Sequence, residues 1–383
     1  MIIHTVKSGD TIFKIARKWG VVPTKIIEDN GLATDRLTVG QELVILIPTR
    51  SVSVRGGDTL AGLAKRFGVR RGTLLSNNPA LKGEEKLRPG HILSVKFDTP
   101  IGGGASALGF YKEGVSENKF KATLPYLTYI VFEGGKIRKD GSIAIPDVSS
   151  AQATAKRMGK ITLLGFCDEG GGKFLEANPK EILEKMIDKA KEGGFAGIRI
   201  SAADAKNLYP NEYSRFLLEA RKRMIGCDLI LFAACEGKSQ EENTELCDGA
   251  ILEIPDENDN FEKTLEYFAE FSESEKTFLK IGTEAKIGDR SAQISDALRL
   301  ALRIGAEIEK ESEISPSSFN YRRYIGGKGE DIKVTFPNPS LIKAKFQKLS
   351  ELGFMGIAFD IESAPVWLLS MFNAYFSRAD FAL

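Results

Sequence analysis

Residues 4–32 read HTVKSGDTIFKIARKWGVVPTKIIEDNGL, and residues 52–81 repeat this pattern as VSVRGGDTLAGLAKRFGVRRGTLLSNNPAL. Gly-Asp-Thr recurs at 9–11 and 57–59, an aromatic-Gly-Val step recurs at 19–21 and 67–69, and Asn30 recurs as Asn78. Equivalent positions lie 48 residues apart. A repeat of this kind indicates two copies of one small structural unit.

Each copy predicts a strand, a helix, a second helix and a closing strand. In the first copy residues 5–6 begin the unit, and Asp10 or Thr11 can cap the helix that follows. The helix carries an apolar stripe and ends at Gly20. Such a unit has a very small core, so its stability depends on compactness and good helix caps.

Both copies resemble the LysM domain, with expected bounds 2–48 and 51–97. The resemblance implies binding of glycans that contain N-acetylglucosamine, such as peptidoglycan or chitin. It places the sugar in a groove between the loop after the first strand and the loop before the second strand. Carried over, the groove consists of Gly9, Asp10, Thr11 and Ile12 with Asn30, Gly31 and Leu32, and of Gly57, Asp58, Thr59 and Leu60 with Asn78, Pro79 and Ala80. Backbone amides and short side chains suit an acetamido group.

The larger part of the chain predicts a (β/α)8 barrel. Residues 98–107, rich in Gly, are expected to form a flexible linker, and residues 108–383 to form the barrel domain. Short apolar runs alternate with amphipathic helical stretches over this region, which favours the barrel. The expected strands are 108–111, 127–132, 161–166, 197–200, 229–233, 250–254, 278–282 and 356–361.

Residues 317–337 depart from the alternation. FNYRRY and DIKVTF flank a Gly-Gly-Lys-Gly turn at 326–329, which predicts a hairpin inserted before the eighth strand.

Within this region the sequence resembles family 18 glycoside hydrolases. The stretches LTYIVFEGGKIRKDGSI and VTFPNPSLIKAKFQKLSELGFMGIAFDI are similar to the LysM-bearing branch that includes spore cortex-lytic and spore-coat N-acetylglucosaminidases. The resemblance extends to domain order and covers nearly the whole chain. It implies a TIM barrel with a glycan cleft at the mouth.

The expected catalytic residues are missing. The family carries Asp-Gly-x-x-x-Asp-x-Glu on its fourth strand, where the Glu protonates the glycosidic oxygen and the last Asp holds the substrate acetamide that acts as nucleophile. Anchored on Gly197, the last Asp becomes Ser201 and the Glu becomes Ala203. The family's acetamide-binding Tyr falls at Pro255 and its pocket-floor Trp at Asp360. We therefore expect an inactive barrel, with no catalytic residue.

Four carboxylates remain as alternatives for a displaced catalytic acid. Asp360 and Glu362 copy the Asp-x-Glu spacing on the eighth strand, where two residues two apart would face the barrel mouth. Asp204 would reach the lost position if the fourth strand bulged, and Asp256 is the retained Asp of the sixth strand. There are two other interpretations. Asp360 and Glu362 could be rim residues in salt bridges, with Arg199 as a candidate partner, or they could form an acidic pocket for a ligand or cation.

Composition excludes several classes. The formal net charge of the 383 residues is +1, which argues against a general nucleic-acid binder. No apolar run is long enough to span a membrane. The only two histidines, His4 and His91, precede the barrel, and we expect no metal and no cofactor. Residues 1–98 carry a net charge of +7, which favours an anionic polymer as the partner.

These observations favour a peptidoglycan-binding protein with a catalytically inactive barrel. An active glycosidase on cortex peptidoglycan or chitin that uses relocated carboxylates is the alternative. A third interpretation is an assembly protein that binds spore-coat proteins. We expect synthesis in the mother-cell cytoplasm without a signal peptide, since MIIHTVKSGD lacks a basic segment followed by an apolar one, and association with the spore envelope.

Overall fold

A computed structural model describes the chain at residues 1–98, 101–176, 178–236, 244–254, 261–271, 273–325 and 328–378. Asp256 lies outside these residues, and the side chain of Asp204 is likewise not described. Among the described residues, no helix combines the length and apolar character needed to cross a membrane.

The two N-terminal units have the predicted order of elements. The first consists of β1 (Ile2–Thr5), α1 (Ile12–Trp19), α2 (Pro23–Asn30) and β2 (Glu42–Ile45). The second consists of β3 (Arg50–Ser53), α3 (Leu60–Phe67), α4 (Arg71–Ser76), the short helix η1 (Pro79–Leu81) and β4 (Ile92–Lys96). In each unit the two strands pair antiparallel.

Local sequence explains where the first helix of each unit begins and ends. Thr11 and Thr59 are the N-caps, and their hydroxyls accept hydrogen bonds from the N–H groups of Lys14 and Gly62. Gly20 ends α1 in the left-handed region at φ 67°, a conformation that costs glycine little.

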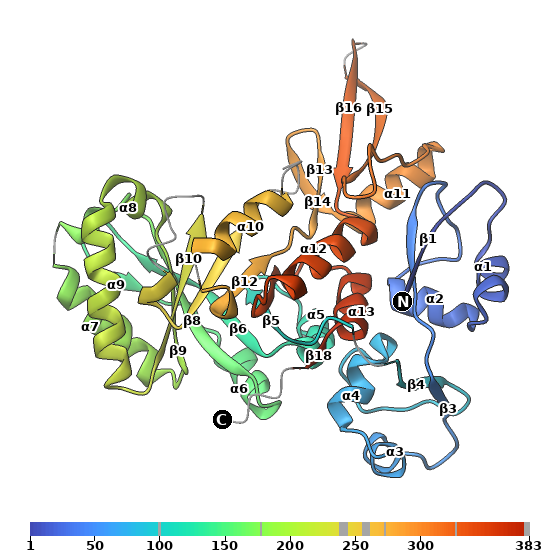
Figure 1. Cartoon of the computed structure of the whole chain (residues 1–383), viewed down its shortest axis with the longest axis horizontal. Coiled ribbons are helices and arrows are strands. Elements are labelled where there is room, and N and C mark those ends of the chain that lie inside the picture. Colours follow the sequence, from blue (N-terminus) through green and yellow to red (C-terminus); the bar gives the residue numbers. More distant parts are fainter. Residues whose placement is uncertain are drawn as a thin grey trace.

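Eight parallel strands close into the predicted barrel. The order in the sheet is β5-β17-β12-β11-β10-β9-β8-β6, and pairing of β6 with β5 completes the ring. The strands are β5 (Gly104–Tyr111), β6 (Tyr129–Ile137), β8 (Ile161–Asp168), β9 (Gly197–Ser201), β10 (Ile230–Glu236), β11 (Gly249–Glu253), β12 (Thr277–Lys280) and β17 (Gly356–Asp360). The helices around it (Figure 1) are α5 (Glu117–Thr123), α6 (Ser149–Arg157), α7 (Pro179–Glu192), α8 (Ala203–Leu208), α9 (Pro210–Ile225), α10 (Phe261–Phe271), α12 (Pro339–Glu351) and α13 (Val366–Tyr375).

Aromatic side chains fill the barrel interior. Tyr129, Phe232 and Phe278 lie with their ring centroids between 5.4 and 6.0 Å apart. They belong to a buried cluster that also holds Phe110 and aliphatic residues from neighbouring strands. The barrel is a packed core, so any site must lie at one of its ends.

The segment before the last barrel strand is larger than the predicted hairpin. β15 (Ser317–Ile325) and β16 (Lys328–Phe336) form that hairpin, but β13 (Glu284–Ile287) and β14 (Arg290–Gln293) extend it to an antiparallel sheet of four strands. The helix α11 (Ile294–Ile304) accompanies this sheet, and the β15–β16 hairpin projects away from the barrel (Figure 1).

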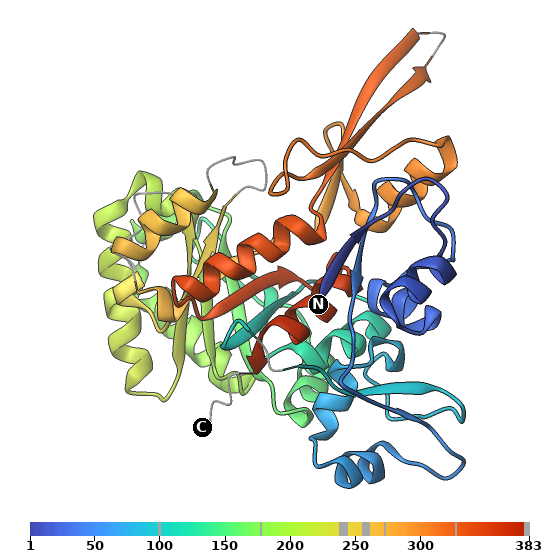
Figure 2. The ribbon, with the colours of Figure 1, turned by 45° about the vertical axis from the view of Figure 1, so that its right-hand side comes forward.

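The N-terminal units pack against the barrel domain (Figure 2). Val44 and Leu46 of the first unit belong to the same buried cluster as the barrel helices, and α2 contacts α13. The predicted linker 98–107 needs correction, because β5 already begins at Gly104 and Ala105 is 3% exposed. Gly104 and Ala105 pair with β18 (Ser377–Arg378), and this pairing, together with burial, extends β5 into the predicted linker.

Candidate functional site

The loop after the first strand leaves short polar groups at the surface of each N-terminal unit. Gly9, Thr11, Gly57 and Thr59 are exposed. Asp10 is turned toward its own loop, where its carboxylate accepts hydrogen bonds from the Lys7 N–H at 2.9 Å and from His4 Nε2 at 3.0 Å. The Lys7 N–H, helped by His4, holds the pKa of Asp10 below its ordinary value. The loop is therefore ordered before any ligand arrives.

The opposite loop of each unit is held by a buried asparagine. The Asn30 amide donates to the carbonyls of Ile26 and Val44, at 2.8 and 2.7 Å, and accepts from the Val44 N–H at 2.7 Å. Asn78 makes the same three bonds to Leu74 and Ser94. These amides connect the second helix to the closing strand, so they shape the loop without presenting a side chain to a ligand.

The fourteen predicted groove residues thus divide by exposure. The exposed members are Gly9, Thr11, Gly31, Gly57, Thr59 and Ala80, the partly exposed ones are Asp10, Leu32, Asp58 and Pro79, and the buried ones are Ile12, Asn30, Leu60 and Asn78. Ile12 and Leu60 are 1% exposed and belong to the core of their units.

Charged side chains cover the aromatic core at the barrel mouth. Arg199 of β9 lies 3.0 Å from the carboxylate of Glu133 on β6, and both side chains are less than one-fifth exposed. The Arg199 guanidinium also lies over the ring of Phe110, at 5.3 Å from its centroid. The Lys280 ammonium also lies over the Phe110 ring, at 5.8 Å from its centroid.

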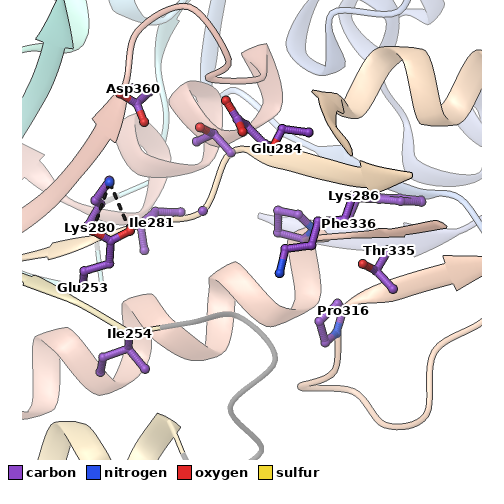
Figure 3. Close-up of a pocket in the computed structure, with 14 residues that line it drawn as sticks. Glu253, Ile254, Lys280, Ile281, Glu284, Lys286, Pro316, Thr335, Phe336 and Asp360 are labelled. Atoms are coloured by element: carbon purple, nitrogen blue, oxygen red, sulfur yellow. Dashed lines mark hydrogen bonds and ion pairs between the residues drawn. The ribbon is translucent and has the colours of Figure 1, made fainter. Parts of the chain in front are cut away.

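Like Glu133 within β6, the carboxylates at the ends of β11 and β17 are paired with cations. Lys280 contacts both carboxylate oxygens of Glu253 at 3.1 Å (Figure 3). Lys112 contacts Asp360 at 2.6 Å. The prediction that Arg199 forms a salt bridge with Asp360 or Glu362 was wrong, because Arg199 pairs with Glu133.

Of the four predicted catalytic alternatives, the structure describes the side chains of Asp360 and Glu362. Asp360 is the last residue of β17, and Glu362 follows in a turn, so the expectation that both lie on one strand was wrong. β17 ends there because pairing with β5 stops at Asp360. On β9, Ser201 is the last strand residue, and Ala203 begins α8. The turn to a helix breaks the strand alternation on which an inward position for residue 203 depends.

Two adjoining cavities lie between the mouth and the inserted sheet. The first is about 340 Å³ and the second about 380 Å³, and they share Glu284, Ser291 and Asp360 in their walls. Figure 3 shows Glu253, Lys280 and Asp360 on the barrel side of the first cavity and Phe336, Thr335 and Pro316 on the side of the inserted sheet. The second is also lined by Glu362, Ser363 and Lys112.

Within the described ranges, no three side chains of the His, Cys, Asp or Glu type come together as a metal site would require. Several features of the mouth were missed from sequence. Lys112, Glu133 and Lys280 were not recognised as partners, because their neighbours come from strands distant in the chain. The alternation of strands and helices, which predicted a barrel mouth lined by strand ends, was the only available signal.

Comparison with known proteins identifies the N-terminal units. The family model of the LysM domain matches residues 4–46 and 52–96, and the chain carries two LysM domains. We call them LysM1 and LysM2. Over 253 residues the chain is 25% identical to YdhD of Bacillus subtilis (strain 168), to which a sporulation-specific glycosylase activity is ascribed. Over 97 residues it is 33% identical to the cell wall-binding protein YocH of the same organism.

The YdhD match covers 63% of this chain and 60% of YdhD, and the YocH match covers 24% of this chain and 33% of YocH. The chain thus matches between one-third and three-fifths of the length of these relatives. Among solved structures, the spore cortex-lytic enzyme SleL of Bacillus cereus superposes with a TM-score of 0.77 at 19% identity, covering 99% of each chain. This likeness shows a shared fold, with two LysM domains ahead of a barrel.

Proposed function

We propose that the protein binds peptidoglycan through its two LysM domains and that its barrel does not cleave the glycan. The similarity to YocH, a cell wall-binding protein, supports the binding part of the proposal. The matched region is similar in length to the two LysM domains together. The exposed loops at Gly9–Thr11 and Gly57–Thr59 offer backbone amides and hydroxyl groups for acetamido groups.

The observation that carries the catalytic part of the proposal lies at the end of β9. Ser201 ends this strand and Ala203 begins the next helix, at the two positions where the family pattern requires carboxylates. An alanine side chain has no proton to donate to a glycosidic oxygen. Loss of the acid that protonates the leaving group removes a contribution of about 10²–10⁴-fold to the rate.

The charges at the mouth support the same conclusion. A carboxylic acid that acts as general acid must carry a proton at the working pH. Glu133, Glu253 and Asp360 are each engaged in an ion pair with an Arg or Lys side chain within 3.1 Å. These ion pairs occupy the three carboxylates and join neighbouring parts of the mouth.

One observation favours the alternative of an active glycosidase on N-acetylglucosamine polymers. Asp360 and Glu362 line the same cavity, and Glu362 is exposed. Among the described residues, no cation lies within salt-bridge distance of the Glu362 carboxylate. If the reaction persists, this pair supplies it. The pairing of Asp360 with Lys112 is the reason we rank this function second.

The likeness to SleL and YdhD supports association with the spore envelope, with peptidoglycan as the principal partner and spore-coat proteins as further candidates. The experiment that tests binding is co-sedimentation of the full chain with purified spore-cortex peptidoglycan. Thr11→Arg combined with Thr59→Arg places a long side chain in each groove and should weaken binding by about tenfold or more.

The matched control is Thr11→Ala combined with Thr59→Ala. It removes the same two helix caps, at a cost of about 1 kcal/mol each, but leaves the grooves open. Retained binding by the alanine variant and loss by the arginine variant is the expected result. Equal binding by both variants and the wild type would contradict the placement of the glycan in these grooves.

A further inference from the structure

One edge of the LysM1 groove lies against the barrel domain. Gly31, an exposed residue of the predicted groove, adopts a φ of 63° and directs its hydrogen atoms toward α13. A Cβ atom placed on Gly31 would meet Cβ and Cγ2 of Val366 at 2.8 Å. Val366 is itself partly exposed, so the two residues form a continuous stretch of surface.

The segment that precedes Val366 also forms the wall of the barrel mouth. Glu362 and Ser363 line the second cavity, together with Asp360 at the end of β17. From Glu362 to Val366 the chain spans at most ~14 Å even if fully extended. The LysM1 groove and the mouth are thus separated by one short segment, residues 361–366, which we call the connecting segment.

The connecting segment is held in place from three directions. Lys119 of α5 donates a hydrogen bond to the carbonyl of Ala364. The hydroxyls of Thr283 and Ser363 lie 2.6 Å apart, and both residues are buried. Gln293 of β14 donates to the Glu362 carbonyl at 3.2 Å.

LysM1 is held just as firmly. The Glu42 carboxylate, 1% exposed, is 2.7 Å from Lys310 of the inserted region and 2.8 Å from the N–H of Ser340 on α12. The Val39 carbonyl accepts from the Ile308 N–H at 2.9 Å. Binding across two surfaces gains most when their relative position is fixed before the ligand arrives.

We infer that the LysM1 groove, the connecting segment and the barrel mouth form one glycan-binding track, occupied by a single glycan chain that contains N-acetylglucosamine. The inference rests on the proposed function of the LysM1 groove. The mouth end of the track is acidic, because Glu113, Glu284, Asp360 and Glu362 line the second cavity with Lys112 as its one cation among the lining residues. Uncharged sugar units suit this environment better than units bearing free carboxylates.

The test is calorimetric titration of the full chain with N-acetylglucosamine oligomers of increasing length. Ser291→Arg obstructs the mouth from β14, since Ser291 is exposed and lines both cavities. Long oligomers should bind this variant about tenfold more weakly than the wild type, whereas short oligomers that fit LysM1 should bind equally. The matched control is Ser295→Arg, an exposed position four residues further along that lines neither cavity.

A second variant, Glu362→Lys, alters the connecting segment at an exposed side chain and should reduce the affinity for long oligomers in the same way. If both variants bind long oligomers as the wild type does, the track is refuted and the glycan leaves LysM1 in another direction. If the wild type binds neither short nor long oligomers nor peptidoglycan, the proposed function itself fails. Circular dichroism of each variant establishes that the fold is retained.

Discussion

The carboxylate of Glu42, in the closing strand of LysM1, accepts hydrogen bonds from both the N–H and the hydroxyl of Ser340, at 2.8 and 2.7 Å. Ser340 lies in the first turn of α12, where backbone N–H groups lack partners within the helix and favour a negative charge. Lys310 completes the site at 2.7 Å from the same carboxylate. One glutamate therefore joins LysM1 to the barrel domain and to its inserted sheet.

Substitution of Glu42 should loosen this junction. Glu42→Ala leaves Lys310 and the first turn of α12 without their carboxylate and should lower the free energy of unfolding by about 3 kcal/mol. Chemical denaturation of the full chain measures the effect. Glu307→Ala, an exposed glutamate on the neighbouring loop, serves as the control and should change stability by less than about 0.5 kcal/mol. Equal stability of the two variants would show that Glu42 contributes nothing to docking.

The buried asparagine of LysM2 should be needed for stability more than for contact with the glycan. Asn78→Ala removes three hydrogen bonds to the backbone of Leu74 and Ser94 and should cost about 3 kcal/mol. Thermal unfolding checks this cost, with the exposed Ser53→Ala as control. Wild-type stability combined with lost glycan binding would instead indicate that Asn78 contacts the sugar.

The junction between the modules should respond to pH through Asp29. This residue is 1% exposed and lies 2.9 Å from Lys25, with Glu28, His91 and Tyr126 as the neighbouring titratable groups. Burial raises the pKa of Asp29 from 3.8 to about 6, although Lys25 acts in the opposite direction. A raised pKa in the folded state means that stability from this group is present below about pH 4 and is lost as the pH rises through about 6.

Asp29→Asn removes this titration while leaving the other groups in place. The stability of the wild type relative to the variant should therefore fall by about 3 kcal/mol between about pH 4 and pH 7. Urea denaturation at several pH values gives both curves. A difference that stays constant over this range would mean that Asp29 titrates as an exposed carboxyl group does.

The parts of the fold that follow from local sequence were predictable. The repeat around Gly9 and Gly57 revealed both LysM units, and the alternation of apolar runs with helices revealed all eight barrel strands. The hairpin of β15 and β16 was predicted, but β13 and β14 were not, because four-residue strands carry too little pattern. The helix α11 packs on the inserted sheet, a placement that the strand–helix alternation does not predict.

Contacts between distant segments were not predictable from one sequence. Glu42 and Ser340 are 298 residues apart in the chain, and nothing in the local pattern of either residue marks it as part of an interface. The same applies to Gly31 and Val366, and to the partners of the mouth carboxylates. The departure from the family 18 pattern around Gly197, in contrast, is a feature of the local sequence, and the inactive barrel that it predicts stays a proposal.

Restoration of that motif alone should not restore cleavage. Ser201→Asp combined with Ala203→Glu returns the two carboxylates of the fourth-strand pattern, but Pro255 and Asp360 still stand where the family has its acetamide-binding Tyr and its pocket-floor Trp. We expect no release of reducing ends from chitooligosaccharides. Cleavage by the double variant would show that these two positions matter less than the sequence comparison implies.

The central claim is that the protein holds peptidoglycan without cutting it, and one paired assay tests it most directly. The full chain is incubated with spore-cortex peptidoglycan, and both the sedimented protein and the released reducing ends are measured in the same sample. We predict sedimentation with no release above a protein-free blank. Release of reducing ends that is abolished by Asp360→Asn, Glu362→Gln, Asp204→Asn or Asp256→Asn would contradict the claim and identify a relocated catalytic acid.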